Sequence, residues 1–297
     1  MFKRLLFLLP VLFLTLAGRS PLLGQEIEDL VSRYTSENGQ GYLQPLADAF
    51  GSNLNSGLFH SARIPRFGLN IELSLETATA LITDEQKTFT ATTDGLFEPV
   101  QSAEVPTIFG DSEPYEVQGT GGTVYTFPGG FAVDRLPIAV PQIAVGSFMG
   151  TQGVLRYINL DLGENFGTLK LLGYGFRHSL SQYLPLLPVD LAATFFRQKF
   201  ELGDIVQASA TYYGIMASKR SGMLELYAAY GFGSSDLDIS YEYEGAEGPE
   251  QISFNLQSES ASRLTLGLAL TLSRLNVHAD FSMGSSNVAG LGVGLTL

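Results

Sequence analysis

The chain has 297 residues, of which 16% are charged and 33 are glycine, and its formal net charge is −13. A typical soluble domain has about 25% charged residues, and no apolar run beyond the N-terminus reaches the ~20 residues of a membrane helix. This composition therefore favours a β membrane protein over a helical one. The acidic balance argues against nucleic acid as a partner.

Residues 1–25 have the pattern of a secretory signal peptide. Lys3 and Arg4 form its basic start, and the apolar stretch runs from Leu5 to Ala17. The alternative, an uncleaved anchor, needs a longer apolar stretch than this. The chain contains no cysteine, so we expect an exported protein that is stabilised without disulfides.

Residues 26–66 differ from the rest of the chain, with two short stretches of helical periodicity followed by a loop-like stretch over residues 53–65. The spacing of Ile27, Leu30 and Tyr34 predicts a short helix that ends at the Asn-Gly-Gln-Gly stretch of residues 38–41. A second short helix is predicted over residues 45–51. The segment could plug a barrel lumen or lie as a lid at its periplasmic mouth. As plug residues we single out Tyr42, Leu46, Phe50 and His60.

The first strand is predicted over residues 67–81, where apolar and polar side chains alternate. Glu72 and Glu76 fall on its polar side and cannot face lipid cheaply. We therefore expect the polar side of this strand to line an aqueous interior.

Residues 83–135 are the least regular part of the chain, with threonine-rich pieces separated by proline and glycine. A connection of this length is long for a loop. Outer-membrane barrels have short periplasmic turns and longer extracellular loops. We therefore predict an extracellular loop region here, and it has room for one extra hairpin of the barrel.

Period-two alternation resumes near residue 136 and continues to the C-terminus. From residue 223 it predicts one long hairpin, whose spacer residues become acidic beyond Gly233. We expect residues 234–260 to be an extracellular extension of this hairpin. Further strands are predicted over residues 138–148, 154–162, 168–178, 189–200, 204–217, 275–283 and 291–297.

These strands predict an all-β fold, an antiparallel transmembrane β-barrel over residues 67–297 with a helical N-terminal plug or lid. Both chain ends are expected in the periplasm, which makes the strand count even. Ten strands follow directly, and a hairpin within residues 83–135 would make twelve. Within a range of 10–14 strands, twelve is our best estimate.

Several charged side chains on the strands are candidates for lining the lumen. In a selective channel they would face water, and in a filled barrel they would form buried ion pairs. Both alternatives stay open. The candidates are Arg156, Lys170, Arg177, Arg197, Glu225, His278 and Asp280.

Catalytic chemistry finds little support in the sequence. His178 and Ser179 are adjacent on a strand and therefore point to opposite faces, which separates a hydroxyl nucleophile from its base. The three histidines, His60, His178 and His278, lack metal-ligand spacing. We expect no enzyme activity and assign no catalytic, cofactor-binding or metal-ligating residue.

Parts of the sequence resemble a known but uncharacterised family of Gram-negative outer-membrane barrels. The likeness is carried by residues 41–65, by the Phe-Gly that opens the strand at residue 67, and by residues 176–185 and 188–192. The resemblance implies an outer-membrane location and no particular activity. In architecture the chain is also loosely similar to long-chain fatty-acid transporters, which combine an N-terminal hatch with a barrel.

Two functions are expected from these patterns. The first is a channel or transporter for small hydrophobic molecules in the cell outer membrane, gated by the N-terminal segment. The second is a structural or surface-interaction protein that transports nothing. The expected partners are outer-membrane lipid, a small hydrophobic ligand and the barrel-assembly machinery during biogenesis.

Overall fold

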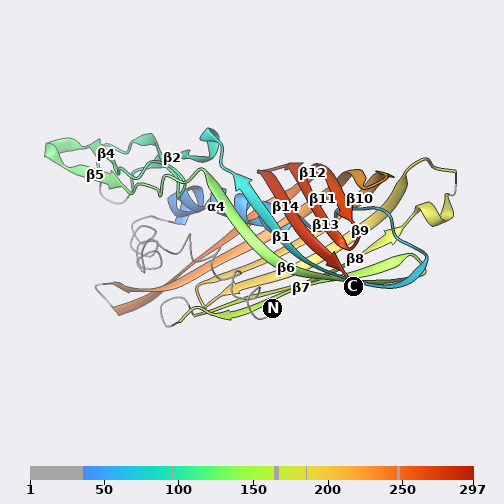
Figure 1. Cartoon of the computed structure of the whole chain (residues 1–297). Coiled ribbons are helices and arrows are strands. Elements are labelled where there is room, and N and C mark those ends of the chain that lie inside the picture. The colour runs from blue at the N-terminus through green and yellow to red at the C-terminus, as the bar shows by residue number, and fades with distance from the viewer. Residues whose placement is uncertain (1–35, 95–96, 164–166, 185, 246–247) are drawn as a thin grey trace.

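The fold is a closed antiparallel barrel with one helix at one of its mouths (Figure 1). The computed structural model describes residues 36–94, 97–163, 167–184, 186–245 and 248–297. The signal peptide and the helix expected before residue 35 lie outside this part. Ten strands close the barrel: β1 (Phe67–Leu81), β6 (Arg135–Phe148), β7 (Thr151–Asp161), β8 (Thr168–Ser179), β9 (Asp190–Leu202), β10 (Val206–Ser221), β11 (Leu224–Gly245), β12 (Gly248–Leu272), β13 (Leu275–Met283) and β14 (Asn287–Thr296).

The strand count of twelve is wrong, because residues 82–134 leave the barrel wall. The ladder between β1 and β6 continues as far as Leu81 opposite Arg135, which leaves no place for a hairpin between them. The excursion instead forms two separate strand pairs, which project from the barrel (Figure 1). Its elements are η1 (Asp84–Gln86), β2 (Thr88–Thr92), β3 (Ser102–Pro106), β4 (Tyr115–Gln118), η2 (Thr120–Gly122) and β5 (Val124–Phe127).

We call residues 82–134 the extension. An ion pair holds its two ends together where they meet the barrel. Lys87 Nζ lies 2.7 Å from Asp134 Oδ1 and 3.3 Å from Asp84 Oδ1. Its hydrogen bond to Asp134 raises the pKa of Lys87 and lowers the pKa of Asp134. The two ends of a long excursion are thus held side by side where they meet the barrel. A further short helix, η3 (Ser181–Tyr183), lies between β8 and β9.

The N-terminal helix α4 (Ser36–Leu54) is longer than predicted, and the expected helix end at residues 38–41 is wrong. Gly39 and Gly41 lie inside the helix because it packs closely there. A Cβ at Gly39 would overlap the ring of Phe254, and a Cβ at Gly41 would overlap the ring of Phe89. These glycines are positions of close approach. Within the described residues, no helix has the length and apolarity to cross a membrane.

The two mouths of the barrel differ. The extension, the tip of the β11–β12 hairpin and α4 lie at one end, which we call the loop mouth (Figure 1). The C-terminus lies at the other end, the terminal mouth, where Leu297 N donates to Ile71 O. Residues 55–66 connect α4 at the loop mouth to the start of β1 at the terminal mouth. The alternative of a lid beside the C-terminus is therefore wrong for α4.

The outside of the barrel carries an apolar belt. On β10 to β14 the outward side chains alternate with buried ones over most of each strand. This is the polarity of a barrel whose outer face meets lipid and whose inner face is polar. The exposed members include Tyr213, Ile215, Leu226, Tyr230, Phe232, Leu266, Leu268, Phe281, Leu291 and Val293.

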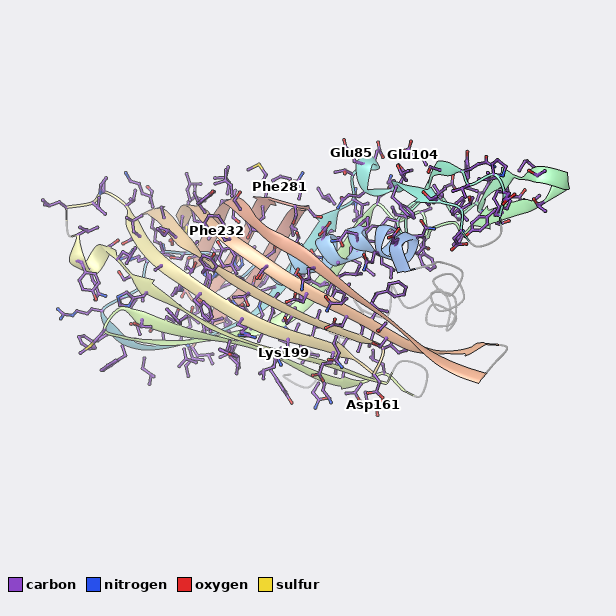
Figure 2. All side chains as sticks on the ribbon, turned by 180° about the vertical axis from the view of Figure 1, so that it is seen from behind. Glu85, Glu104, Asp161, Lys199, Phe232 and Phe281 are labelled. Atoms are coloured by element: carbon purple, nitrogen blue, oxygen red, sulfur yellow. The ribbon has the colours of Figure 1, made fainter. Side chains whose placement is uncertain are left out.

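The polarity of the wall is reversed toward the loop mouth. There Leu171 on β8 and Leu237 and Ile239 on β11 point inward and are buried. Lys170 is exposed on the outside and pairs with Glu201 at 3.8 Å. Figure 2 shows Asp161 and Lys199 on the outer surface toward the same mouth. This end of the barrel is built like a soluble protein, with an apolar inside and a charged outside.

The barrel wall has a break between β6 and β7. Their ladder runs from Phe148 opposite Thr151 to Gln142 opposite Arg156 and then stops, although both strands continue toward the loop mouth. The two ribbons diverge in Figure 1. Along the break β6 stays paired with β1, and Ile82 N donates to Asp134 O, so the even-numbered residues of β6 bond to β1 there.

The sequence of β6 accounts for this break. Pro137 and Pro141 are odd-numbered, so their nitrogens face β7. Proline has no N–H to donate to a ladder, and within sheets it is confined to strand edges. Of the positions on β6 that face β7 in the break, only Ala139 retains a donor.

Paired cysteines test the break, because the natural chain has none. In a continued register, Ala139 would lie opposite Asn159. We expect Ala139→Cys/Asn159→Cys to remain reduced under mild oxidation, since the strands have separated. Ile143→Cys/Leu155→Cys, on a paired stretch, should form a disulfide, because opposed antiparallel residues have Cα atoms about 4.5–5.5 Å apart. Gel mobility of the oxidised protein measures both, and equal disulfide yields would contradict the break.

Candidate functional site: the plugged lumen

The lumen is occupied by the chain itself. Residues 52–61 run through it without regular pairing to the wall, so their carbonyl groups need other donors. Arginine and glutamine side chains of the wall supply them. The bonds run from Arg263 to Ser52 O, from Gln198 and Arg156 to Leu54 O, from Arg156 to Ser56 O and Gly57 O, from Gln142 to Leu58 O, and from Arg177 to Ser61 O.

Arg156 on β7 is the centre of this arrangement. Its side chain is fully buried, and it lies over the ring of Phe196 at 5.3 Å. Nη2 donates to Ser56 O at 3.1 Å and to Gly57 O at 2.5 Å, and Nε donates to Gln142 Oε1 at 2.9 Å. A guanidinium group has five N–H donors in a fixed plane, which suits it to binding several carbonyl groups at once.

We call residues 36–66, which occupy the lumen, the plug. A second set of hydrogen bonds holds the plug nearer the terminal mouth. Arg177 Nη1 donates to Ser61 O, and Ser61 Oγ donates to Glu225 Oε1 at 2.5 Å. Ala62 N donates to Ser218 Oγ at 3.0 Å. The plug is therefore bound through its backbone as well as its side chains, by a positive group on β8 and a negative group on β11.

The lumen at the loop mouth is apolar. α4 packs its buried face on inward side chains from β1, β6, β8, β10, β11, β12 and β14. Phe50 meets Phe200 edge to face, with ring centroids 4.9 Å apart. This apolar half of the lumen includes Tyr42, Leu43, Ala47, Leu54, Ala78, Val140, Leu171, Leu237, Phe254 and Val288, with Leu46, Phe50, Ile138 and Ile158 packed against them.

The lumen at the terminal mouth is polar and partly empty. A cavity of about 550 Å³ opens there between the plug and the wall. It is lined mostly by polar and charged side chains, including His60, Glu72, Arg177, Arg220 and Glu225. The barrel thus has an apolar half that is packed and a polar half that contains a cavity.

The candidate lumen residues divide between the two faces of the wall. Arg156, Arg177, Glu225 and His278 are buried inside the barrel, and Asp280 points inward to accept a hydrogen bond from Tyr227 at 3.0 Å. Lys170 and Arg197 lie on the outside, so their assignment to the lumen is wrong. Both follow the reversed polarity near the loop mouth, where polar residues point outward.

The plug candidates lie on the segment that fills the lumen. Tyr42 is fully buried and donates to Gly129 O at 3.0 Å, while Leu46 and Phe50 pack in the apolar half. His60 stacks on His278, a contact that sequence spacing did not reveal because the two lie on different elements. The third histidine, His178, contacts Thr151 Oγ1 at 2.7 Å and Tyr183 OH at 3.2 Å, away from this pair.

Comparison with known proteins identifies the family. A family model described as a family of unknown function, DUF6588, matches residues 1–297. The chain belongs to the DUF6588 family. No curated protein matches the sequence.

Some solved outer-membrane barrels are similar to this DUF6588 protein at low identity. The loop L8 deletion mutant of OmpT from Vibrio cholerae has 12% identity and a TM-score of 0.27, covering 78% of this chain and 98% of that one. OpdO of Pseudomonas aeruginosa has 10% identity and a TM-score of 0.23, covering 79% of this chain and 98% of that one. The Ralstonia pickettii toluene transporter TbuX has 8% identity and a TM-score of 0.24, covering 81% of this chain and 90% of that one. The barrel fold is established by the strand pairing within this chain.

Proposed function

We propose that this DUF6588 protein is an outer-membrane β-barrel that admits small hydrophobic molecules, with residues 36–66 as the gate. One observation carries the proposal: the break between β6 and β7 adjoins the apolar half of the lumen. Val140 on β6 and Ile158 on β7 border the break and also belong to that apolar cluster. A hydrophobic molecule at the outer face of the barrel therefore meets an apolar interior there.

The proposed location follows from the apolar belt and the signal peptide expected in the sequence. A closed barrel with lipid-facing side chains outside fits a bilayer. With the C-terminus in the periplasm, the loop mouth faces outward and the break opens at the level of Tyr157. There the outward side chains of β7 change from apolar to polar, at Asn159.

The proposed path has two stages. A molecule first passes the break and displaces part of α4 from the apolar half. It then passes the backbone-bound stretch of residues 54–61 and reaches the polar cavity at the terminal mouth. The second stage requires the plug to shift, because wall side chains hold its carbonyl groups across the lumen.

The uptake of 1-N-phenylnaphthylamine by cells tests this function, since this hydrophobic probe fluoresces in apolar surroundings. We expect expression of the full chain to raise the uptake rate several-fold over cells with an empty vector. Val140→Asn makes the apolar half polar and should remove most of the increase. Val124→Asn, the same change at an exposed position on β5 of the extension, should leave it unchanged.

Uptake rates are compared only for variants that migrate differently on gels before and after boiling, because this difference shows that the barrel has folded. No increase on expression, or equal uptake by Val140→Asn and the full chain, would contradict the proposal.

A second function, surface interaction, is favoured by the extension over residues 82–134. Its β4–β5 pair projects well beyond the barrel (Figure 1). Removing residues 115–127 should then abolish adhesion of expressing cells to a surface or partner while leaving probe uptake intact. Loss of uptake with unchanged adhesion would count against this function.

A further inference from the structure

Two histidines and two glutamates meet where the plug contacts the barrel wall. His60 comes from the plug, Glu72 and Glu76 from β1, and His278 from β13. The imidazole rings of His60 and His278 stack with centroids 4.3 Å apart. His278 Nε2 lies 2.8 Å from Glu76 Oε2, and His60 Nε2 lies 3.5 Å from Glu72 Oε1.

His278 has a polar partner at each ring nitrogen. Asn276 Nδ2 donates to Thr271 Oγ1 at 3.2 Å, which turns Asn276 Oδ1 toward His278 Nδ1 at 2.9 Å. If His278 Nδ1 donates to Asn276 Oδ1, then Nδ1 carries a proton. Nε2 then presents a lone pair to the Glu76 carboxylate, so that two acceptors face each other at 2.8 Å.

In this tautomer the two acceptors need a cation, either a second proton on His278 or a metal ion. A second proton on His278 would satisfy this pair alone. It would leave Glu76 Oε1 without a partner, although that atom is buried in a side chain that is only 3% exposed. One ligand atom each from His60, Glu76 and His278 also lie within 4.8 Å of one another. A divalent metal ion uses all of these groups at once.

We propose that His60, Glu76 and His278 bind a divalent transition-metal ion of the Zn²⁺ class, with Glu72 beside them. Two imidazoles and a carboxylate are a ligand set that Zn²⁺ favours. The hydrogen bond from His278 to Asn276 is the outer-shell support that metal-binding histidines usually have. His60 and Glu72 line the polar cavity, which gives the ion a route from the terminal mouth.

The consequence of the site is a metal link between plug and wall. One ligand comes from the plug and two from strands that are distant in sequence. Bound metal would hold residue 60 against β1 and β13. Metal binding itself does not depend on the transport proposed above.

Titration of the folded full chain with Zn²⁺ tests the site, using protein without a histidine tag. We expect one ion per chain by calorimetry, and Co²⁺ in its place should give a visible absorption band. His60→Ala and His278→Ala should each weaken Zn²⁺ binding by no less than the roughly 10–100-fold typical of losing an outer-shell partner. His178→Ala, which changes the remote histidine, should bind like the natural chain.

Gly292→Ala offers a further variant that keeps every ligand. A Cβ at residue 292 would overlap both His278 Nε2 and Glu76 Oε2, so it should also weaken binding. Heat-dependent gel migration reports folding in each case. Two results would overturn the site and leave the transport proposal standing. One is an absence of Zn²⁺ binding to the natural chain, and the other is Zn²⁺ affinity in folded His60→Ala and His278→Ala equal to that of the natural chain.

Discussion

Deleting residues 36–66 is expected to turn a closed barrel into an ion-conducting one. In planar bilayers the full chain should give no resolved conductance steps, because this segment fills the lumen and wall side chains bind its carbonyl groups. Without it, Arg156, Arg177 and Arg263 would face an aqueous interior. The deletion variant should therefore give discrete conductance steps.

Two controls make this result specific to the plug. Deletion of residues 115–127 removes a shorter segment, from the extension outside the lumen, and should not open the barrel. A synthetic peptide of residues 36–66 added to the deletion variant should reduce its conductance. Equal absence of steps in the full chain and in a correctly folded deletion variant would contradict a plug.

Substituting Arg156 should have the largest effect of any single wall residue. In Arg156→Met, Ser56 O and Gly57 O lose their donor inside the barrel. A buried polar group left without a partner costs about 1–3 kcal/mol, so the free energy of unfolding should fall by about 3 kcal/mol. Denaturant unfolding of the barrel in lipid vesicles measures the change.

Arg197→Met is the matched control for this prediction. It makes the same chemical change on the outside of β9, where Arg197 is exposed. Surface substitutions away from special features usually change stability by no more than about 0.5 kcal/mol. If the two variants lost stability equally, the account of Arg156 as the main anchor of the plug would be wrong.

The barrel is the part of the structure that its sequence predicts best. β1 and β13 have the predicted bounds of residues 67–81 and 275–283, and the other wall strands differ from their predicted ranges at the ends only. Alternation works here because most outward side chains face one kind of surroundings over a full strand. The assignment of Lys170 and Arg197 to the lumen is wrong because this condition does not hold near the loop mouth. There the apolar side of the wall turns inward to meet α4.

Other features depend on contacts between distant elements. The helix passes through Gly39 and Gly41 because aromatic rings from β12 and β2 lie against it, and local propensity says nothing of those rings. His60 and His278 meet only because the plug runs back through the barrel. Pro141 on the predicted strand and Pro137 just before it are a local signal that was available: prolines indicate a strand edge, and the structure has a break at that edge.

The central claim is that α4 must leave its seat for a hydrophobic molecule to pass. Ser52 on α4 and Ser285 in the β13–β14 turn have hydroxyl oxygens 3.1 Å apart, so Ser52→Cys/Ser285→Cys can lock the helix to the wall in a chain without other cysteines. The measurement is phenylnaphthylamine uptake by cells expressing this variant, oxidised and then reduced. We predict that uptake falls to the empty-vector rate on oxidation and returns on reduction. Undiminished uptake with the disulfide fully formed would contradict the account.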